Sequence, residues 1–159
     1  MKSQRITKGS ILEISIDNRY YIYAQILGKS SYVFFDYKSV DKIVDLNLLK
    51  DKKILFIISV FDQIITKGEW PKVGKLDIRK ELEVLPMNFI QDALNPTNFE
   101  LYNPNTGEIV PITKNEIIGL ERAAVWDKNH VEDRVRDFYN NVPCVWLEND
   151  RELFNRVFP

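Results

Sequence analysis

Residues 10–27 read SILEISIDNRYYIYAQIL, and this stretch decides the fold. Over residues 10–16 apolar and polar side chains alternate, with the period of two that a half-buried strand requires. Asp17 and Asn18 then supply a turn, because their side chains hydrogen-bond nearby main chain and tolerate left-handed backbone. Residues 19–27 return as a second strand, rich in tyrosine and isoleucine. The stretch therefore predicts an antiparallel hairpin.

The following residues extend this hairpin into a larger sheet. A turn at residues 28–30 leads into a third strand over residues 31–35. Short, twisted strands bury little surface unless their sheet curls, so we expect a small, strongly curved sheet or a partly open barrel. After a lysine-bearing connection at residues 38–53, the apolar run at residues 54–61 predicts a central strand that is buried on both faces.

The middle of the chain predicts an ordered loop and a second hairpin. Pro71 restricts Trp70 to extended backbone, which indicates an ordered loop around the tryptophan. Short strands are expected at residues 88–93 and 98–102. A connection rich in proline, asparagine and glycine then leads to a strand at residues 108–111, and such a connection is typical of a hairpin turn.

The last third of the chain carries the helical signals. Thr113 and Glu116 have the spacing of a capping box, which predicts a short helix. Residues 120–126 are compatible with either an irregular segment or a strand. Asp127 is a candidate N-cap for a helix at residues 128–140.

Apolar and charged side chains separate onto two faces of this helix. The predicted apolar face holds Val131, Val135, Phe138 and Tyr139. The opposite face holds Glu132, Asp133, Arg136 and Asp137. A second cap pattern at residues 149–152 predicts a last short helix, which contains Leu153, Phe154 and Val157.

These elements define an α+β fold with a mainly antiparallel, strongly curved sheet or partly open barrel. One clear C-terminal helix and one or two short helices accompany the sheet. With 159 residues and no repeat or flexible linker, the chain is expected to form a single domain over residues 1–159.

Composition indicates a cytoplasmic protein. The single cysteine, Cys144, cannot form an internal disulfide, and small secreted domains more often carry several paired cysteines. Residues 1–9 are not followed by the apolar block of a signal peptide. The most apolar run, residues 54–61, is far shorter than the roughly 20 residues of a membrane-spanning helix, so no membrane partner is expected.

The charge is polarised along the chain. Residues 1–80 contain 15 Lys and Arg against 9 Asp and Glu, whereas residues 81–159 contain 7 against 14. If this polarity survives folding, an acidic surface could steer a basic protein partner. The alternative is that the charges are spread evenly over a solvated surface.

No catalytic, metal or cofactor site is predicted. Metal sites need several histidine, cysteine or carboxylate ligands at recognisable spacing, and the chain has one histidine and one cysteine. His130 and Cys144 would lie ~20 Å apart along an intact helix, which argues against a nucleophilic pair. The six glycines are dispersed, so no phosphate-binding loop is formed. Glu132 and Asp133 are neighbours on a helix and do not face each other.

Clustered aromatic residues leave open a nucleic-acid-binding function. They could form a stacking platform for bases, as on barrels that bind single strands. The alternative is that they are core residues and cross-strand pairs, which the near-neutral net charge of −1 favours. The residues concerned are Tyr20, Tyr21, Tyr23, Tyr32, Phe34 and Phe35.

Several stretches resemble the immunity protein 26 family of bacterial polymorphic toxin and contact-dependent competition systems. They cover about 130 residues in matching order and spacing. Serine stands at position 10, where we expect an acidic residue, and residues 38–53 have no counterpart among the shared stretches. The shared stretches are KGSILEI at 8–14, RYYIYAQILG at 19–28, GEWPKVG at 68–74, FIQD at 89–92, and GLERAAVW at 119–126, which runs on into HVEDRV at 130–135.

This resemblance implies a cytoplasmic binder that occludes the toxic domain of a cognate effector protein, with no catalytic residues of its own. An inhibitor of this kind needs shape, charge complementarity and a few anchors, not a reactive centre. Trp70, Trp126 and Arg134 are expected to be structural. The predicted contact residues lie on or near the acidic helix face and are Glu121, Asp127, Glu132, Asp133 and Asp137.

Two other classes of function remain open from the sequence. A small barrel-type nucleic-acid-binding module would bind single strands with a steep dependence on salt. An enzyme with a dispersed active site would leave no contiguous motif. The sequence favours the protein-binding inhibitor over both, and no enzyme activity is expected.

Overall fold

The computed structural model describes the backbone of residues 2–157 and the side chains of residues 2–151. The chain divides into two compact units, which are described separately. Unit 1 comprises Met1–Val84 and Val125–Lys128, and unit 2 comprises Leu85–Ala124 and Asn129–Pro159. The prediction of a single domain stays a prediction.

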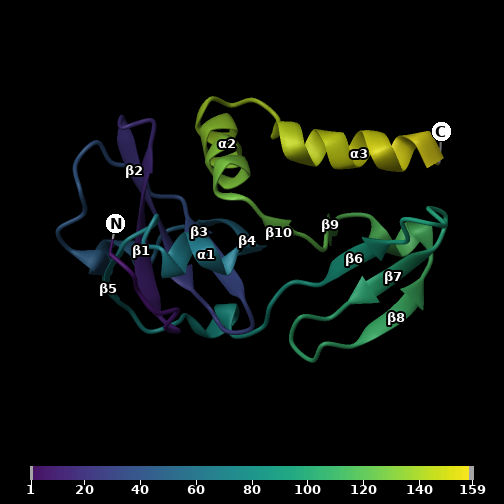
Figure 1. The fold of residues 1–159 in the computed structure, drawn as a ribbon, viewed down its shortest axis with the longest axis horizontal. Helices are drawn as coiled ribbons and strands as arrows, with labels where there is room; N and C mark the ends of the chain where they lie inside the picture. Colours follow the sequence, from purple (N-terminus) through teal and green to yellow (C-terminus); the bar gives the residue numbers. More distant parts are fainter. Residues whose placement is uncertain (1, 158–159) are drawn as a thin grey trace. The chain divides into compact units, whose positions relative to one another are not determined.

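Unit 1 contains a six-stranded, mostly antiparallel sheet (Figure 1). Its strand order is β10-β4-β3-β2-β1-β5, and only β10 runs parallel to its neighbour. The strands are β1 (Ser10–Ile16), β2 (Tyr20–Ile26), β3 (Ser31–Phe35), β4 (Ile54–Val60), β5 (Lys72–Lys75) and β10 (Val125–Trp126).

The predicted hairpin and third strand are confirmed, and both turns use left-handed backbone. Asp17 and Asn18 have φ angles of 54° and 55° between β1 and β2. Lys29 and Ser30 have φ angles of 58° and 60° between β2 and β3, so Gly28 does not supply the left-handed residue. Two-residue turns with positive φ at both positions match the right-handed twist of the strands they join.

One face of this sheet forms the main core of unit 1. The strand register places Leu12, Ala24, Phe34 and Phe56 side by side across four strands, and all four are buried. The rings of Phe34 and Phe56 lie 4.7 Å apart. Each large apolar side chain buried in this way contributes about 1.5–3 kcal/mol.

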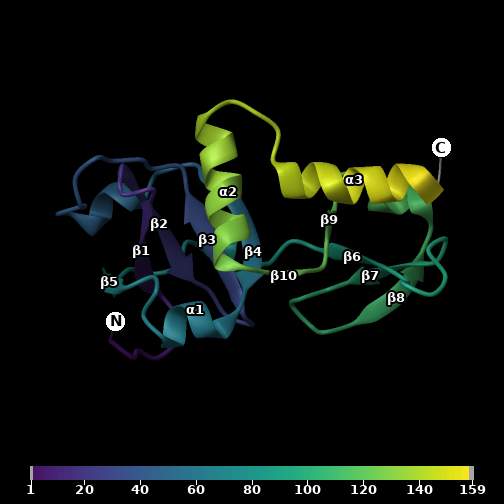
Figure 2. The same ribbon diagram turned by 45° about the horizontal axis from the view of Figure 1, so that its top comes forward.

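Helix α1 (Asp62–Thr66) and the loop around Trp70 belong to the same core. Trp70 is 1% exposed and its ring meets Phe34 edge-on at 5.9 Å, which confirms the ordered loop. Ile65 of α1 is fully buried. Figure 2 shows α1 against the sheet from a second direction. The short helix α1 was not predicted.

The second face of the sheet is covered by two connections. Leu49 from the segment 38–53 and Leu82 from the segment after β5 are both buried. Arg79 donates a hydrogen bond from Nη2 to the Leu49 carbonyl at 2.6 Å, and its guanidinium lies over the Phe35 ring. These segments include the short turns η1 (Leu46–Leu49) and η2 (Lys80–Leu82).

The prediction of one strongly curved sheet or partly open barrel is wrong. The sheet of unit 1 is open, with β10 and β5 at its two edges, and a second sheet lies in unit 2. Curling is not needed because the two connections already cover the second face. The prediction that residues 54–61 are buried on both faces is also wrong, since buried and half-buried residues alternate along β4.

Unit 2 contains a four-stranded sheet in the order β8-β7-β6-β9. The predicted second hairpin is confirmed as β7 and β8. Phe89, Phe99 and Ile117 form the buried core beside this sheet. The strands are β6 (Asn88–Gln91), β7 (Phe99–Tyr102), β8 (Ile109–Ile112) and β9 (Glu121–Arg122).

Residues 120–126, which the sequence left open, supply one short strand to each sheet. Within this segment, Glu121–Arg122 pairs in parallel with β6, and Val125–Trp126 pairs in parallel with β4. Two residues separate the two strands. The segment is therefore part of both hydrogen-bonded ladders.

The predicted capping box at Thr113 does not form. The Thr113 hydroxyl donates to the Glu116 carboxylate at 3.1 Å and does not cap the turn. The predicted short helix is the turn η3 (Lys114–Ile117), whose hydrogen bonds span three residues.

Unit 2 ends with two helices, as predicted, but the second is as long as the first, where a short helix was expected. Helix α2 (Lys128–Tyr139) is confirmed, with Val131 and Val135 fully buried. Phe138 is 48% exposed, whereas Arg134 is buried, so the apolar face was predicted only in part. Helix α3 (Val145–Val157) starts before the predicted cap at residues 149–152, which therefore lies inside the helix.

The predicted apolar side chains of the last helix, Leu153, Phe154 and Val157, lie outside the described side chains. No helix within residues 2–157 has the length and apolar composition that crossing a membrane requires.

Candidate partner-binding surface

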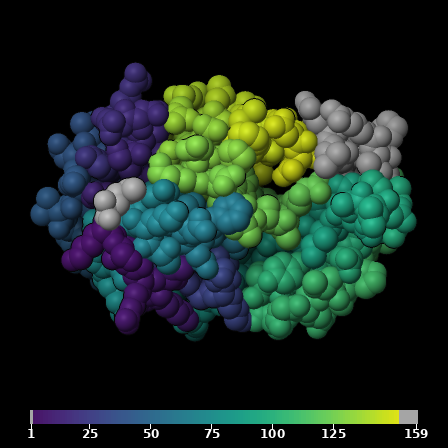
Figure 3. Space-filling view, viewed as in Figure 1, coloured from purple at the N-terminus to yellow at the C-terminus, as the bar shows by residue number. Residues whose placement is uncertain are grey.

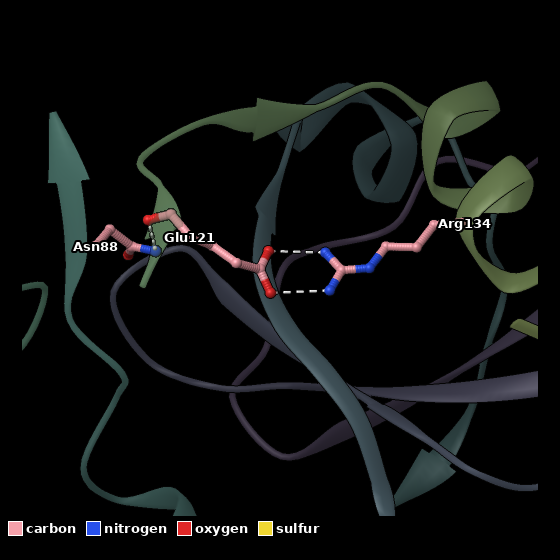
Figure 4. A network of polar contacts seen from close by, with 3 residues as sticks. All are labelled: Asn88, Glu121 and Arg134. Carbon is pink, nitrogen blue, oxygen red and sulfur yellow. Dashed lines mark hydrogen bonds and ion pairs between the residues drawn. The ribbon is translucent and has the colours of Figure 1, made fainter. Parts of the chain in front are cut away.

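A buried arginine connects helix α2 to strand β9. Arg134 Nη1 and Nη2 each donate to one carboxylate oxygen of Glu121, both at 2.8 Å (Figure 4). The side chain of Arg134 is 10% exposed and that of Glu121 is 38% exposed. A two-point contact of this kind fixes orientation as well as distance. Arg134 is therefore structural, as the sequence predicted.

The same glutamate takes part in the β6–β9 pairing. Asn88 donates from Nδ2 to the main-chain carbonyl of Glu121 at 3.3 Å. Glu121 thus joins a strand through its backbone and a helix through its carboxylate. The carboxylate is already paired with Arg134 inside unit 2. A role for Glu121 as a contact residue toward a partner stays a prediction.

Asp133 binds two groups of its own unit. Arg136 Nη1 lies 2.7 Å from Oδ1, and Trp146 Nε1 donates to Oδ2 at 3.0 Å. Since Trp146 lies in the first turn of α3, this carboxylate connects the two helices. The sequence did not identify Trp146 as a partner of Asp133, because 13 residues and a chain reversal separate them.

Asp137 holds the corner between the two helices. Its Oδ2 accepts a hydrogen bond from the Val145 main-chain amide at 3.2 Å, and its carbonyl accepts one from the Val142 amide at 3.0 Å. Asn141 has a φ of 57°, so the chain leaves α2 through a left-handed residue. Asp137 therefore contributes to the shape of the corner.

Glu132 and Asp127 complete the predicted set. Glu132 is half-buried on α2, and Asp127 is exposed and belongs to unit 1. The structure thus brings four of the five predicted residues together in unit 2, on or bonded to α2. Three of these four, Glu121, Asp133 and Asp137, hold the unit together.

A second ion pair attaches α3 to the sheet of unit 2. Arg122 Nε lies 3.3 Å from Asp150 Oδ1, and Arg122 Nη2 donates to Gln91 at 2.8 Å. Burial raises the pKa of Asp150, and the neighbouring Arg122 charge opposes that rise. Sequence spacing gave no signal for this pair, because 28 positions separate its members.

The predicted distance between His130 and Cys144 assumed one intact helix, and the structure does not have this arrangement. The chain reverses after α2, and the His130 ring stacks on Trp146 at a centroid distance of 3.5 Å. Trp146 lies two positions beyond Cys144, so helix length alone was a poor guide to distance. The histidine packs against an indole ring, and the cysteine is a half-buried free thiol.

The charge polarity of the sequence coincides with the division into units. Unit 1 contains 16 Lys and Arg against 12 Asp and Glu, a net charge of +4. Unit 2 contains 6 against 11, a net charge of −5. The acidic half is thus one folded unit, and its field favours approach of positively charged surfaces.

The aromatic residues considered as a base-stacking platform are mostly core. Tyr23, Tyr32, Phe34 and Phe35 are all 2% exposed or less. Core packing and cross-strand pairing thus account for these four aromatic residues.

Among the side chains of residues 2–151, no group of three or more His, Cys, Asp and Glu is placed to hold a metal ion.

A family model described as immunity protein 26 matches residues 7–100, more than half of the chain. No curated protein sequence and no solved structure is significantly similar to the chain. The match spans the strands β1 to β6 and the start of β7. It confirms the resemblance for the stretches between residues 8 and 92, and the stretches at 119–126 and 130–135 lie beyond the matched residues. The five predicted contact residues all lie beyond it.

Proposed function

Because the chain belongs to the immunity protein 26 family, we propose that it is a cytoplasmic immunity protein that binds the toxic domain of a cognate bacterial effector and neutralises it by occlusion. The family match over residues 7–100 carries this proposal. Family membership implies the immunity role, and the mode of inhibition is our inference.

Stoichiometric binding accounts for the features of the chain better than catalysis does. An occluding inhibitor works through a stable complementary surface. The ionisable groups on and around α2 are used to hold elements together: Glu121 pairs with Arg134, and Asp133 binds Arg136 and Trp146. We therefore propose that the protein is not an enzyme.

We further propose that the acidic surface of unit 2 steers the toxin domain during association. The net charge of −5 on this unit supports a basic surface on the partner. Glu132 is the proposed contact on this surface, and Asp127 is a separate proposed contact on unit 1. Glu121, Asp133 and Asp137 contribute charge to the same surface while they position its elements.

A protection experiment tests the proposed function. The adjacent reading frame is expected to encode a large secreted protein with a variable C-terminal domain. Expression of that domain alone should stop bacterial growth, and coexpression of this chain should restore it. Growth arrest that persists despite soluble, folded chain would refute the proposal.

A matched pair of charge reversals tests the proposed surface separately. Glu132→Lys on α2 and Glu108→Lys at the exposed turn before β8 change the charge of unit 2 equally. We expect only Glu132→Lys to slow association with the toxin domain and to reduce its dependence on salt. Equal rates for both variants would discard the surface but leave the immunity role intact.

A further inference from the structure

The segment 38–53 displays three apolar side chains to solvent. Val40 is 76% exposed, Val44 is 99% exposed and Leu48 is 47% exposed. Single exposed apolar residues are common on protein surfaces, so exposure alone carries no conclusion. The three side chains recur every four residues, and Ile43 and Leu46 between them are half-buried.

The inward side of the segment is fixed to the sheet of unit 1. Leu49 is fully buried, and its carbonyl accepts the hydrogen bond from Arg79. Leu46 lies against strand β5, so close that a Cβ added at Gly74 would clash with its Cδ1. The segment therefore packs through one side and exposes the other.

Main-chain hydrogen bonds fix the first half of the segment. Ser39 and Tyr21 exchange two main-chain hydrogen bonds, at 2.7 and 3.0 Å. The Ile43 amide donates to the hydroxyl of Tyr23 at 2.8 Å. Val40 thus follows one anchored residue, and Val44 follows another.

A buried carboxylate supports these anchors. Glu13 on β1 is 6% exposed and accepts a hydrogen bond from the Tyr23 hydroxyl at 3.0 Å. Lys42 Nζ lies 3.6 Å from the same carboxylate, and the lysine side chain is 68% exposed. A buried charge is costly unless it is paired, so this arrangement ties Lys42 and Ile43 to the sheet.

An anchored segment of this kind loses little conformational freedom on binding. Ordering a flexible loop opposes association, whereas a preformed surface avoids that loss. In Figure 1 the segment is drawn in blue beside the edge of the unit 1 sheet, and Figure 3 shows its atoms at the surface. The three apolar side chains are thus displayed on a supported backbone.

The charge of the segment indicates what kind of surface fits it. Residues 38–53 contain five lysines and three aspartates, in a unit of net charge +4. Asp36 precedes the segment, and Asp45 is engaged in capping η1. Aspartates follow both valines directly, but lysines outnumber aspartates over the segment, so a partner surface with carboxylates around an apolar recess would be complementary to it.

We infer that Val40, Val44 and Leu48 form an apolar contact surface that inserts into a carboxylate-bordered apolar recess of the cognate toxin domain. This inference rests on the proposed function. It adds a second contact surface, on unit 1, to the acidic surface of unit 2.

Binding measurements on the full chain and the neighbouring toxin domain test this inference. The triple variant Val40→Ser, Val44→Ser, Leu48→Ser should weaken binding by about 30-fold or more, mainly through faster dissociation. The control Val84→Ser alters a 72% exposed valine of the same unit and should change binding by less than about twofold. Circular dichroism should show unchanged folding of both variants.

The outcomes distinguish a failure of the contact surface from a failure of the immunity role. If the unmodified chain binds the toxin domain and the triple variant binds it equally well, the contact surface is wrong and the immunity role stands. If the unmodified chain does not bind, the proposed function fails and this inference fails with it. Equal weakening by Val84→Ser would also overturn the assignment to the segment.

Discussion

Arg134 donates one hydrogen bond to each carboxylate oxygen of Glu121, and both bonds measure 2.8 Å. Glu121 lies in GLERAAVW and Arg134 lies in HVEDRV, two of the stretches on which the family resemblance rests. The structure pairs these stretches directly. The contact assigns both residues a role in the assembly of unit 2.

Breaking this pair should destabilise the protein. Arg134→Ala removes both bonds and is expected to lower the free energy of unfolding by about 2 kcal/mol, reduced from the fully buried case because Glu121 is partly exposed. A double-mutant cycle with Glu121→Ala should show a coupling above about 1 kcal/mol.

The pair Arg151–Glu148 serves as the control for that cycle. It also joins an arginine to a glutamate, at 3.1 Å, but the arginine side chain is 68% exposed. Its coupling should stay below about 0.5 kcal/mol, as for most exposed pairs on helices. Equal couplings in urea unfolding would contradict the role assigned to Arg134.

Carboxylates of unit 2 should respond differently to neutralisation, according to the contacts they make. Asp133→Asn weakens the contacts to Arg136 and Trp146, so thermal unfolding should shift to lower temperature by several degrees, which corresponds to about 1–2 kcal/mol. Trp146 emission should also move to longer wavelength as its ring becomes more solvated.

Glu108→Gln is the matched substitution at an exposed position of the same unit. It should shift the unfolding temperature by no more than the equivalent of about 0.5 kcal/mol. A larger loss for Glu108→Gln than for Asp133→Asn would reverse the assignment of Asp133 as the connection between α2 and α3.

Alkaline pH should destabilise unit 1. Burial, and to a lesser extent the charge of Asp62, raises the pKa of Tyr32 from 10.0 to about 12, and burial raises the pKa of Tyr23 above its ordinary value. The folded state therefore retains protons that the unfolded state releases above pH 10. Stability from these groups is fully present below pH 10 and is lost as the pH rises toward 12.

The substitution Tyr32→Phe tests that dependence. It removes one of the two titrating groups and should flatten the fall in unfolding free energy between pH 10 and 12, as measured by urea titration. At pH 7 the substitution should lower the free energy of unfolding by at most about 1 kcal/mol, because the Tyr32 hydroxyl has no protein hydrogen-bond partner within the described residues. An unchanged slope would show that Tyr32 does not contribute.

We expect the two units to unfold together. Residues 125–128 belong to unit 1 but lie in sequence between the two parts of unit 2. Strand β10 pairs with β4 through these residues, so the chain of unit 2 is interrupted by a strand of the unit 1 sheet. Calorimetry should give one transition with equal calorimetric and van't Hoff enthalpies. Two resolved transitions would show independent domains.

Local patterns in the sequence predicted the strands well and the sheet shape poorly. Alternation over residues 10–16 and the Asp17-Asn18 turn gave the first hairpin because both signals act between neighbours in the chain. The open sheet is accompanied by contacts between distant segments: Arg79 donates a hydrogen bond to the Leu49 carbonyl, and both Leu49 and Leu82 are buried. Nothing in the spacing of these two leucines indicates where they pack.

The candidate surface shows the same division between local and distant information. Helical periodicity placed Glu132, Asp133 and Asp137 on α2, and the structure confirms that element. Sequence could not show that Asp133 binds Trp146 or that Asp137 binds the Val145 amide, because both contacts require the chain to reverse after α2. Acidic residues that looked available for a partner therefore proved to be internal connections.

Titration of the toxin domain's activity with purified chain tests the central claim most directly. An occluding binder predicts that activity falls linearly and reaches zero at one chain per toxin domain. Activity that disappears at a small fraction of that ratio would indicate catalytic inactivation. Toxin activity that persists in excess of the chain would show that the chain does not inhibit the toxin domain.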